Sequence, residues 1–508
     1  MNNFNKKSSV YQPLVYAFLL SVGLLVGFKI SNPEHFFVRK SDIKDYSSGG
    51  SGKVEEVIRF IDSKYVYDID AAKLTEIAVS SLIDELDPHS NYLSKAELKK
   101  VNEQMSGHYN GIGIETLQDG DDTLVVINIL KDSPASKSGI KKFDRIISVD
   151  DEFIAEINRK ETVLPKENGQ KTNLLIDREG EPIELTISNG LVSSESTCMA
   201  MSINDSVSYV KIVQFNADVY KDFNFALESL SPQKIKHLIV DLRGNPGGYL
   251  PETAKILSLF FEEKDKLLVK TVDKSGKASE YKSTGRQFFQ VDKIAVIVDS
   301  NSASGSEIVA GAIQDWDRGV IVGQPTYGKG LVQEQYALNN GGAIRLTIAE
   351  YLTPSGRFIQ KPFKEQAIDT QQFYSLIHKR PLASRSGIIP DLLIDIPSEC
   401  FKSLTNGLAI TSYDIIRNQE WDKANPPNEI KNLSFEELNR MASKQILDSK
   451  NSFSPQCIAE LERQIKYTIF SLLYTEDKAF EIMQDADPYV QEAMTSITSR
   501  ELLVKSYE

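Results

Sequence analysis

Runs of β-forming residues alternate with helical apolar patterns between about residues 193 and 397, and this alternation most constrains the fold. Residues 209–215 and 235–242 are predicted strands, and residues 218–230 between them form an amphipathic helical pattern. Strands that alternate with helices are typical of a sheet covered by helical layers, so the pattern predicts an α/β core. The alternation continues with helices at 252–261 and 308–314 and strands at 294–298, 320–323, 332–338 and 343–351, the last two joined by a hairpin at 339–342.

The whole chain has 508 residues, which is too many for one hydrophobic core and predicts several domains. Composition shifts and a Gly/Ser linker at 47–52 suggest the boundaries. We predict a signal anchor or signal peptide at 1–33, a linker with N-terminal helices at 34–103, a β-rich domain at 104–192, the α/β core at 193–397 and a helical extension at 398–508.

An apolar run at residues 14–28 follows Lys6 and Lys7 and precedes Lys29. This arrangement predicts a secretory signal or an uncleaved anchor, with a buried core helix as a third interpretation. No small-x-small cleavage site follows the run, which favours the anchor over a cleaved signal. Under either leading interpretation the rest of the chain is exported. We expect it in the cell envelope, either anchored at the inner membrane with its catalytic part in the periplasm, or released as an exported protein.

The charge and the cysteines exclude several classes of function. A net charge of −13 argues against nucleic acid as a partner, because a phosphate-binding face needs a basic excess. Cys198, Cys400 and Cys457 share no metal-ligand spacing, so we expect mostly buried free thiols, with one incidental disulfide as the alternative. We expect neither a metal nor an organic cofactor.

Residues 104–192 begin with a glycine-flanked turn at Gly111-Ile112-Gly113-Ile114. A strand at 124–130, a short helix at 133–139 and a strand at 144–149 follow. This order resembles a PDZ domain, although Lys142-Phe143-Asp144 stands where that family usually has Pro-Gly-Asp. The resemblance implies that residues 111–114 hold the C-terminus of a bound peptide through backbone N–H groups. The alternative is a small structural module.

Three serines, Ser302, Ser304 and Ser306, lie between the strand at 294–298 and the helix at 308–314. A serine at a strand-to-helix turn has free helical N–H groups beside it, and the helix dipole there favours a developing negative charge. This position suits a nucleophile, and the local pattern leaves all three serines as candidates.

A serine nucleophile needs a base, and histidine is the usual one. None of the five histidines follows a strand end of the predicted core, and there is no Gly-x-Ser-x-Gly elbow. Lys329, between Gly328 and Gly330, can serve instead if its ammonium is desolvated. Gln333 would share one strand face with Leu331, next to this lysine, and its amide oxygen could accept from the lysine side chain.

Several motifs together resemble the carboxyl-terminal processing proteases, also called tail-specific proteases. They occur in that family's order at 86–93, in the PDZ-like block, and at 241–248, 301–307, 326–333, 353–357 and 387–391. The resemblance covers roughly residues 55–397 and implies a crotonase/Clp-protease-like α/β core, with an N-terminal helical region and a C-terminal helical extension around it.

The resemblance also assigns roles. In that family the lysine base lies 25 residues after the nucleophile, and a glutamine four residues later orients it; this spacing selects Ser304, Lys329 and Gln333. The oxyanion donors are then expected to be the backbone N–H of Gly305, where the family often has alanine, and that of Gly247 or Gly248.

The sequence therefore predicts an exported serine endopeptidase that cleaves unstructured C-terminal tails of proteins. Its partners would be protein or peptide substrates and, through the N-terminal segment, a membrane; a homo-oligomer or an adaptor is left open. A catalytically silent peptide-binding scaffold of the same fold is the alternative, and a Ser–His ester hydrolase is a third hypothesis that the histidine positions disfavour.

Overall fold

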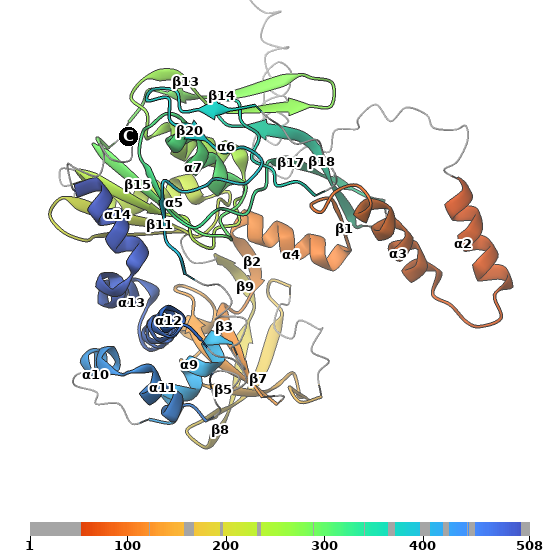
Figure 1. Cartoon of the computed structure of the whole chain (residues 1–508). Coiled ribbons are helices and arrows are strands. Elements are labelled where there is room, and N and C mark those ends of the chain that lie inside the picture. Colours follow the sequence, from red (N-terminus) through yellow and green to blue (C-terminus); the bar gives the residue numbers. More distant parts are fainter. Residues whose placement is uncertain are drawn as a thin grey trace, which may run out of the picture. The chain divides into compact units, whose positions relative to one another are not determined.

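The computed structural model describes residues 52–120, 122–156, 167–193, 197–230, 235–287, 289–339, 341–363, 371–396, 407–419, 426–443, 446 and 453–498 (Figure 1). The chain divides into two compact units, Met1–Lys95 with Glu334–Leu346 and Ala96–Gln333 with Thr347–Glu508. The predicted anchor at 14–28 lies outside the described residues. Within the part that is described, no helix is long and apolar enough to cross a membrane.

The first unit contains the two predicted helices, α2 (Gly52–Lys64) and α3 (Ala71–Asp84). Asp70 caps α3, because its carboxylate accepts hydrogen bonds from the amides of Ala72 and Lys73. A short strand, β1 (Asn91–Leu93), pairs antiparallel with the first residues of β18 (Ala343–Leu352). The second unit begins within the next helix, α4 (Lys95–Ser106).

The α/β core is built on a six-stranded sheet. Its strand order is β10 (Cys198–Ser202), β11 (Val207–Ile212), β12 (His237–Asp241), β15 (Lys293–Val298), β16 (Val320–Gly323) and β21 (Leu392–Leu393). All neighbouring strands are parallel except β10 and β11. Parallel strands are usually covered on both faces. For that reason the sequences of these strands are nearly continuous apolar runs.

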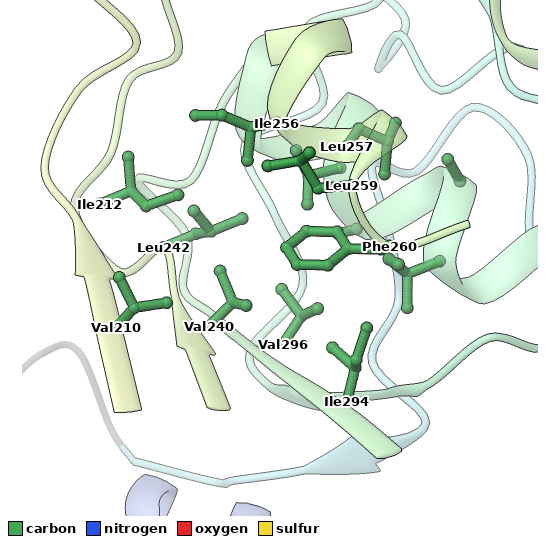
Figure 2. Packing of buried hydrophobic residues seen from close by; sticks show 14 of the residues in the cluster. Val210, Ile212, Val240, Leu242, Ile256, Leu257, Leu259, Phe260, Ile294 and Val296 are labelled. Atoms are coloured by element: carbon green, nitrogen blue, oxygen red, sulfur yellow. The ribbon is translucent and has the colours of Figure 1, made fainter. Parts of the chain in front are cut away.

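Alternate residues of each strand enter two separate hydrophobic clusters. Val240 and Val296 pack with α5 (Val219–Ser229), α6 (Leu250–Ser258) and α7 (Gly305–Asp315) in the larger cluster, part of which is shown in Figure 2. Ile239 and Ile297 point to the opposite face. Full burial of side chains of this size contributes roughly 1.5–3 kcal/mol each, so both layers stabilise the sheet.

The opposite face of the sheet is covered by the C-terminal helices α13 (Glu476–Met483) and α14 (Pro488–Thr498). Helix α14 packs against β12, β15 and β16, and Figure 1 shows it alongside β15. The remaining helices of this segment are α9 (Leu408–Arg417), α10 (Pro426–Asn432), α11 (Phe435–Met441) and α12 (Pro455–Leu473), which share a cluster of their own. A 3-10 turn, η3 (Gln484–Ala486), joins α13 to α14.

A second sheet next to the core contains a long hairpin of β13 (Lys264–Asp273) and β14 (Ala278–Thr284), which the sequence did not predict. Strand β18 pairs with β13 and with β17 (Leu331–Ala337), so the predicted hairpin of the last two strands is confirmed. Two short strands, β19 (Phe373–Tyr374) and β20 (Pro381–Leu382), form a separate pair.

The β-rich domain contains a sheet in the order β3 (Ile114–Asp119), β4 (Thr123–Ile129), β5 (Arg145–Val149), β7 (Lys171–Arg178) and β8 (Glu181–Ser188), with β6 (Glu152–Phe153) paired to β5. The predicted short helix is the 3-10 turn η1 (Ala135–Lys137). Strands β2 (His108–Gly111) and β9 (Gly190–Ser193) pair where the chain enters and leaves the domain. Phe143 has a φ of 71°, a conformation that suits glycine, and its ring lies 5.8 Å from that of Tyr413.

For the cysteines, the structure agrees with the alternative that included a disulfide, and the expectation of free thiols is wrong for Cys457. Cys198 is a free and buried thiol, as expected, but Cys457 is disulfide-bonded. Cys400 lies outside the described residues.

Candidate active site

The strand-to-helix turn between β15 and α7 contains the three candidate serines. Ser302 and Ser306 are fully buried, and their hydroxyl groups donate to the carbonyl oxygens of Leu242 (2.8 Å) and Asn245 (2.9 Å). Both hydroxyls therefore hold the turn against the loop that follows β12. Ser304 is partly exposed and stands directly before the first residue of α7.

Ser304 has an unusual backbone conformation, with φ 50° and ψ −107°. Residues with a side chain rarely adopt positive φ, and such strain costs about 1–3 kcal/mol. Strain of this kind persists where the surroundings fix the residue, and it clusters at active sites. The conformation presents Ser304 at the head of a helix whose first N–H groups are not used within the helix.

A buried carboxylate, Glu307, joins the turn of the three serines (residues 302–306, the serine turn) to the turn that contains Lys329 (residues 326–330, the lysine turn). Its Oε2 accepts from the amide of Ser304 at 2.9 Å and from the amide of Lys329 at 2.8 Å. Its Oε1 accepts from the Thr326 hydroxyl at 2.5 Å and from the Gly328 amide at 2.7 Å. Because one oxygen atom receives both amides, the backbones of Ser304 and Lys329 must be close neighbours.

Burial raises the pKa of the Glu307 carboxyl above its ordinary value, and the four hydrogen bonds oppose that rise. All four donors satisfy the ionised form, so the carboxylate is the species that matches this geometry. The residue is fully buried, and its loss would leave donors on both turns without an acceptor.

Tyr351 of β18 makes a second link between the two turns. Its hydroxyl group contacts the carbonyl oxygens of Ser304, at 3.3 Å, and of Lys329. The side chain is almost completely buried. Two independent groups, a carboxylate and a phenol, thus connect the same pair of residues.

The lysine side chain is oriented by the predicted glutamine. Lys329 Nζ donates to Gln333 Oε1 at 2.8 Å, and Gln333 lies on β17 immediately after the turn. The flanking glycines are required by close packing: a Cβ on Gly328 would lie 2.5 Å from the Lys361 side chain, and one on Gly330 would lie 2.9 Å from the Gln360 amide. Lys361 in turn donates to the Thr326 carbonyl at 2.8 Å.

The glycines after β12 lie directly against the serine turn. A Cβ on Gly247 would lie 2.7 Å from Ser304 Cβ and from the Gly305 amide nitrogen, so only glycine fits there. The Gly247 amide donates to Asn245 Oδ1 at 2.8 Å. Phe215 pairs with the backbone on either side of Gly248: its amide donates to the Gly247 carbonyl oxygen, and its carbonyl oxygen accepts from the Tyr249 amide. The Gly248 amide takes no part in these two hydrogen bonds. The structure therefore brings Gly247 directly against Ser304 and Gly305, and Gly248 follows it in the same loop.

The two remaining motifs of the core form a buried ion-pair network beside α7. Arg357 is 1% exposed and pairs with Asp315 at 2.7 Å. Arg380 pairs with Asp317 at 2.8 Å and with Asp391 at 2.6 Å. This network fixes the C-terminal end of α7, whose N-terminal end carries the serine turn.

In the β-rich domain, the predicted peptide-binding residues connect β2 to β3. Ile112 is buried in the domain core, and Gly113 has a φ of 82°. A Cβ on Gly113 would lie 2.3 Å from Ser133 Cβ, so the turn requires glycine. Among the described residues, no group of three or more His, Cys, Asp or Glu side chains is arranged to hold a metal ion.

Comparison with known proteins identifies the class. The sequence pattern of peptidase family S41 matches residues 206–369, and that of the PDZ domain matches residues 110–188. The carboxy-terminal processing protease CtpB of Bacillus subtilis (strain 168) is 30% identical over 431 residues, covering 80% of this chain and 87% of that protein. CtpA of the same organism is 31% identical over 342 residues, covering 64% of this chain and 71% of that protein.

Among solved structures, the photosystem II D1 C-terminal processing protease is similar with a TM-score of 0.38 and 23% identity, covering 68% of this chain and 89% of that one. The fold and the family matches define a serine peptidase that carries a PDZ domain. More particularly, the chain belongs to the carboxy-terminal processing proteases of peptidase family S41. The predicted family, fold class and enzyme class are confirmed.

Proposed function

We propose that this protein is an exported endopeptidase that cleaves unstructured C-terminal tails with Ser304 as nucleophile and Lys329 as general base. The observation that carries the proposal is the shared acceptor, Glu307 Oε2, which holds the Ser304 and Lys329 amides within hydrogen-bond distance of one atom. The bond from Lys329 Nζ to Gln333 supports it, because a flexible lysine needs a neighbour to aim it.

Catalysis proceeds through an acyl-enzyme. The neutral amine of Lys329 takes the proton of the Ser304 hydroxyl as Oγ attacks the scissile carbonyl. When the tetrahedral intermediate collapses, the C–N bond breaks and the protonated lysine returns this proton to the departing amine. Water, activated by Lys329, then hydrolyses the ester and restores the serine.

Two backbone amides stabilise the oxyanion. Gly305 supplies one at the start of α7, where the helix dipole favours negative charge. Gly248 is the better candidate for the second, because the Gly247 amide already donates to the Asn245 side chain. Gly247 has a different role: because it has no side chain, the loop can approach Ser304 closely.

The PDZ domain supplies substrate selection. Its turn from Gly111 to Ile114 would receive the terminal carboxylate, and the tail would add along β3 as an extra strand. The scissile bond then lies within the same extended chain, so that the enzyme acts near the C-terminus of its substrate.

Export is supported by two features. The apolar run at 14–28 has the flanking lysines of a signal anchor, and a disulfide at Cys457 suits an oxidising compartment. We expect the full chain to sediment with membranes and a chain without residues 1–33 to be recovered in the soluble fraction. Recovery of the full chain in the soluble cell fraction would reject the anchor.

The dyad is tested by Ser304→Ala and Lys329→Ala in the purified full chain. Each should reduce cleavage of a peptide with an unstructured, apolar C-terminus by more than ~1,000-fold, because nucleophile and base act as one unit. Ser300→Ala and Lys274→Ala, which change exposed residues, are the matched controls and should cleave normally.

Turnover of Ser304→Ala or Lys329→Ala at the wild-type rate would reject the assignment. A wild-type chain that binds the tail but neither cleaves it nor reacts with a serine-directed phosphonate would instead favour a silent scaffold.

A further inference from the structure

The C-terminal helical segment reaches the loop that carries the proposed oxyanion donor. Arg243 is the second residue after β12. Two carboxylates bind its guanidinium group, each at a different edge. On one edge, Nη2 pairs with Asp241 at 2.5 Å. On the other, Nη1 pairs at 2.9 Å with Asp487, which belongs to the C-terminal segment.

Asp487 is 5% exposed and lies immediately before α14. Its Oδ1 accepts from the amides of Tyr489 and Val490, so the carboxylate also caps the helix. The Arg243 guanidinium lies 4.8 Å from the centre of the Tyr489 ring. The segment therefore offers Arg243 a negative charge and an aromatic face, both within α14 or its cap.

Arg243 immediately precedes the loop Gly244–Gly248. The second residue of this loop is fixed to the serine turn, because Asn245 O accepts from the amide of Ala303 and the hydroxyl of Ser306. The near side begins at Arg243, whose amide and side chain both bond to Asp241. A displaced Arg243 would move the loop at its point of attachment.

Helix α12 also contributes to the pair of Arg243 and Asp487, through Arg463. Arg463 pairs with Glu460 on its own helix at 2.6 Å and donates to Asp487 Oδ2 at 3.5 Å. Asp487 thus accepts from two arginines, and both Arg243 and Arg463 reach its Oδ2. A carboxylate between two guanidinium groups is fixed more closely than a single pair would be, which makes it a suitable anchor for Arg243.

We propose that Asp487 is a positioning residue for the proposed peptidase reaction: through Arg243 it sets the position of the Gly244–Gly248 loop and hence of its oxyanion donor. The proposal rests on the proposed function of that loop. It assigns the C-terminal segment a part in catalytic geometry, exerted through Arg243, beyond covering the sheet.

The test compares Asp487→Asn with Asp485→Asn in the full-length chain. Asparagine keeps an oxygen that can cap α14 but places an NH₂ group where Arg243 and Arg463 need an acceptor. Asp241 still neutralises Arg243 in this variant, so the fold should survive. Asp485 is an exposed acid two residues earlier and provides the same change of charge.

Three quantities are measured for each variant: kcat per active site titrated with a serine-directed phosphonate, KM, and affinity for a peptide boronate. The boronate forms a tetrahedral adduct that needs the oxyanion donors, whereas substrate binding does not. We expect Asp487→Asn to lower kcat by about tenfold or more, with a matching loss of boronate affinity and KM within about twofold. Asp485→Asn should match the wild type.

A merely structural role would reduce the number of titratable sites but leave kcat per site and boronate affinity unchanged, and that result would overturn the proposal. So would a change confined to KM. If Asp487→Asn does not fold, Asp487→Ser, which also retains a capping oxygen, replaces it; failure of both to fold would make Asp487 a determinant of folding and reject the positioning role. Full activity of Ser304→Ala would reject the proposed function itself, which separates the two failures.

Discussion

At the scale of single residues, Glu307 explains why the serine and lysine turns occur together. The resemblance to the carboxyl-terminal processing proteases selects Ser304, Lys329 and Gln333, because that family keeps fixed intervals between these positions; the local pattern alone leaves three serines open. The four donors to Glu307 come from segments on either side of a strand, so its role depends on tertiary structure. The Ser304-x-x-Glu307 spacing of a capping box was the available signal, and it indicates only the bond to Ser304.

Replacing Glu307 with glutamine should impair catalysis more than folding. Glutamine can accept at one oxygen, but its NH₂ group then faces N–H donors that the carboxylate satisfied. A buried unsatisfied donor costs about 1–3 kcal/mol, and we expect kcat to fall roughly 10- to 100-fold. Steady-state cleavage of a tail peptide measures this, with the exposed Glu262→Gln as control. Wild-type kcat in Glu307→Gln would contradict the role of the carboxylate.

The same residue predicts a pH dependence of stability. Burial raises the folded-state pKa of Glu307, so between the unfolded and folded pKa values the folded chain binds more protons than the unfolded chain. The stability of the wild type relative to Glu307→Gln should therefore increase as the pH falls through the folded pKa, and become constant below the unfolded pKa. Differences in Tm measured from pH 4 to pH 8 test this sign; a relative loss of wild-type stability on acidification would show that the hydrogen bonds outweigh burial.

At the scale of elements, the sequence predicted those with strong periodicity and missed those that depend on partners. The strands β12 and β15 and the helix α7 were found because their apolar runs are short, buried and bounded by turns. The hairpin of β13 and β14 was missed because β13 contains three lysines and two aspartates among its ten residues, and most of β14 is exposed. Its register is set by pairing with β18, which sequence reading did not provide.

The loop after β12 makes a specific prediction for Gly247→Ala. The added Cβ would lie 2.7 Å from three atoms of the serine turn, and the residue has a φ of 94°. The loop must therefore move away from Ser304, and we expect kcat to fall ~100-fold or more, as for the loss of an oxyanion donor. Gly276→Ala is the matched control, since Gly276 has a φ of 80° but nothing within 4 Å of its Cβ position. It should lose about 1 kcal/mol of stability and keep its kcat; similar kcat values for the two variants would contradict the steric argument.

At the scale of the whole molecule, the C-terminal segment was predicted as helical, but its role was not. Helical periodicity identifies an apolar face without naming the surface that it covers. The structure shows that Phe480, Tyr489 and Val490 pack on the sheet residues Ile239 and Ile297. What appeared in sequence as an extension therefore completes the core.

This packing predicts the result of removing residues 398–508. Truncation would expose the face of a parallel sheet formed by Val207, Tyr209, Ile239, Ala295, Ile297, Val320 and Val322, all of which are buried in the intact chain. Sheets of this kind are stable when both faces are covered, and an exposed apolar face of this extent promotes aggregation. We expect the truncated chain to be insoluble or to bind a hydrophobic dye such as ANS strongly, whereas removal of residues 1–51, which precede the first described helix, should leave a soluble and active enzyme. A soluble truncated chain with normal kcat would show that the helices are dispensable to the core, and it would also be incompatible with a catalytic contribution from Asp487.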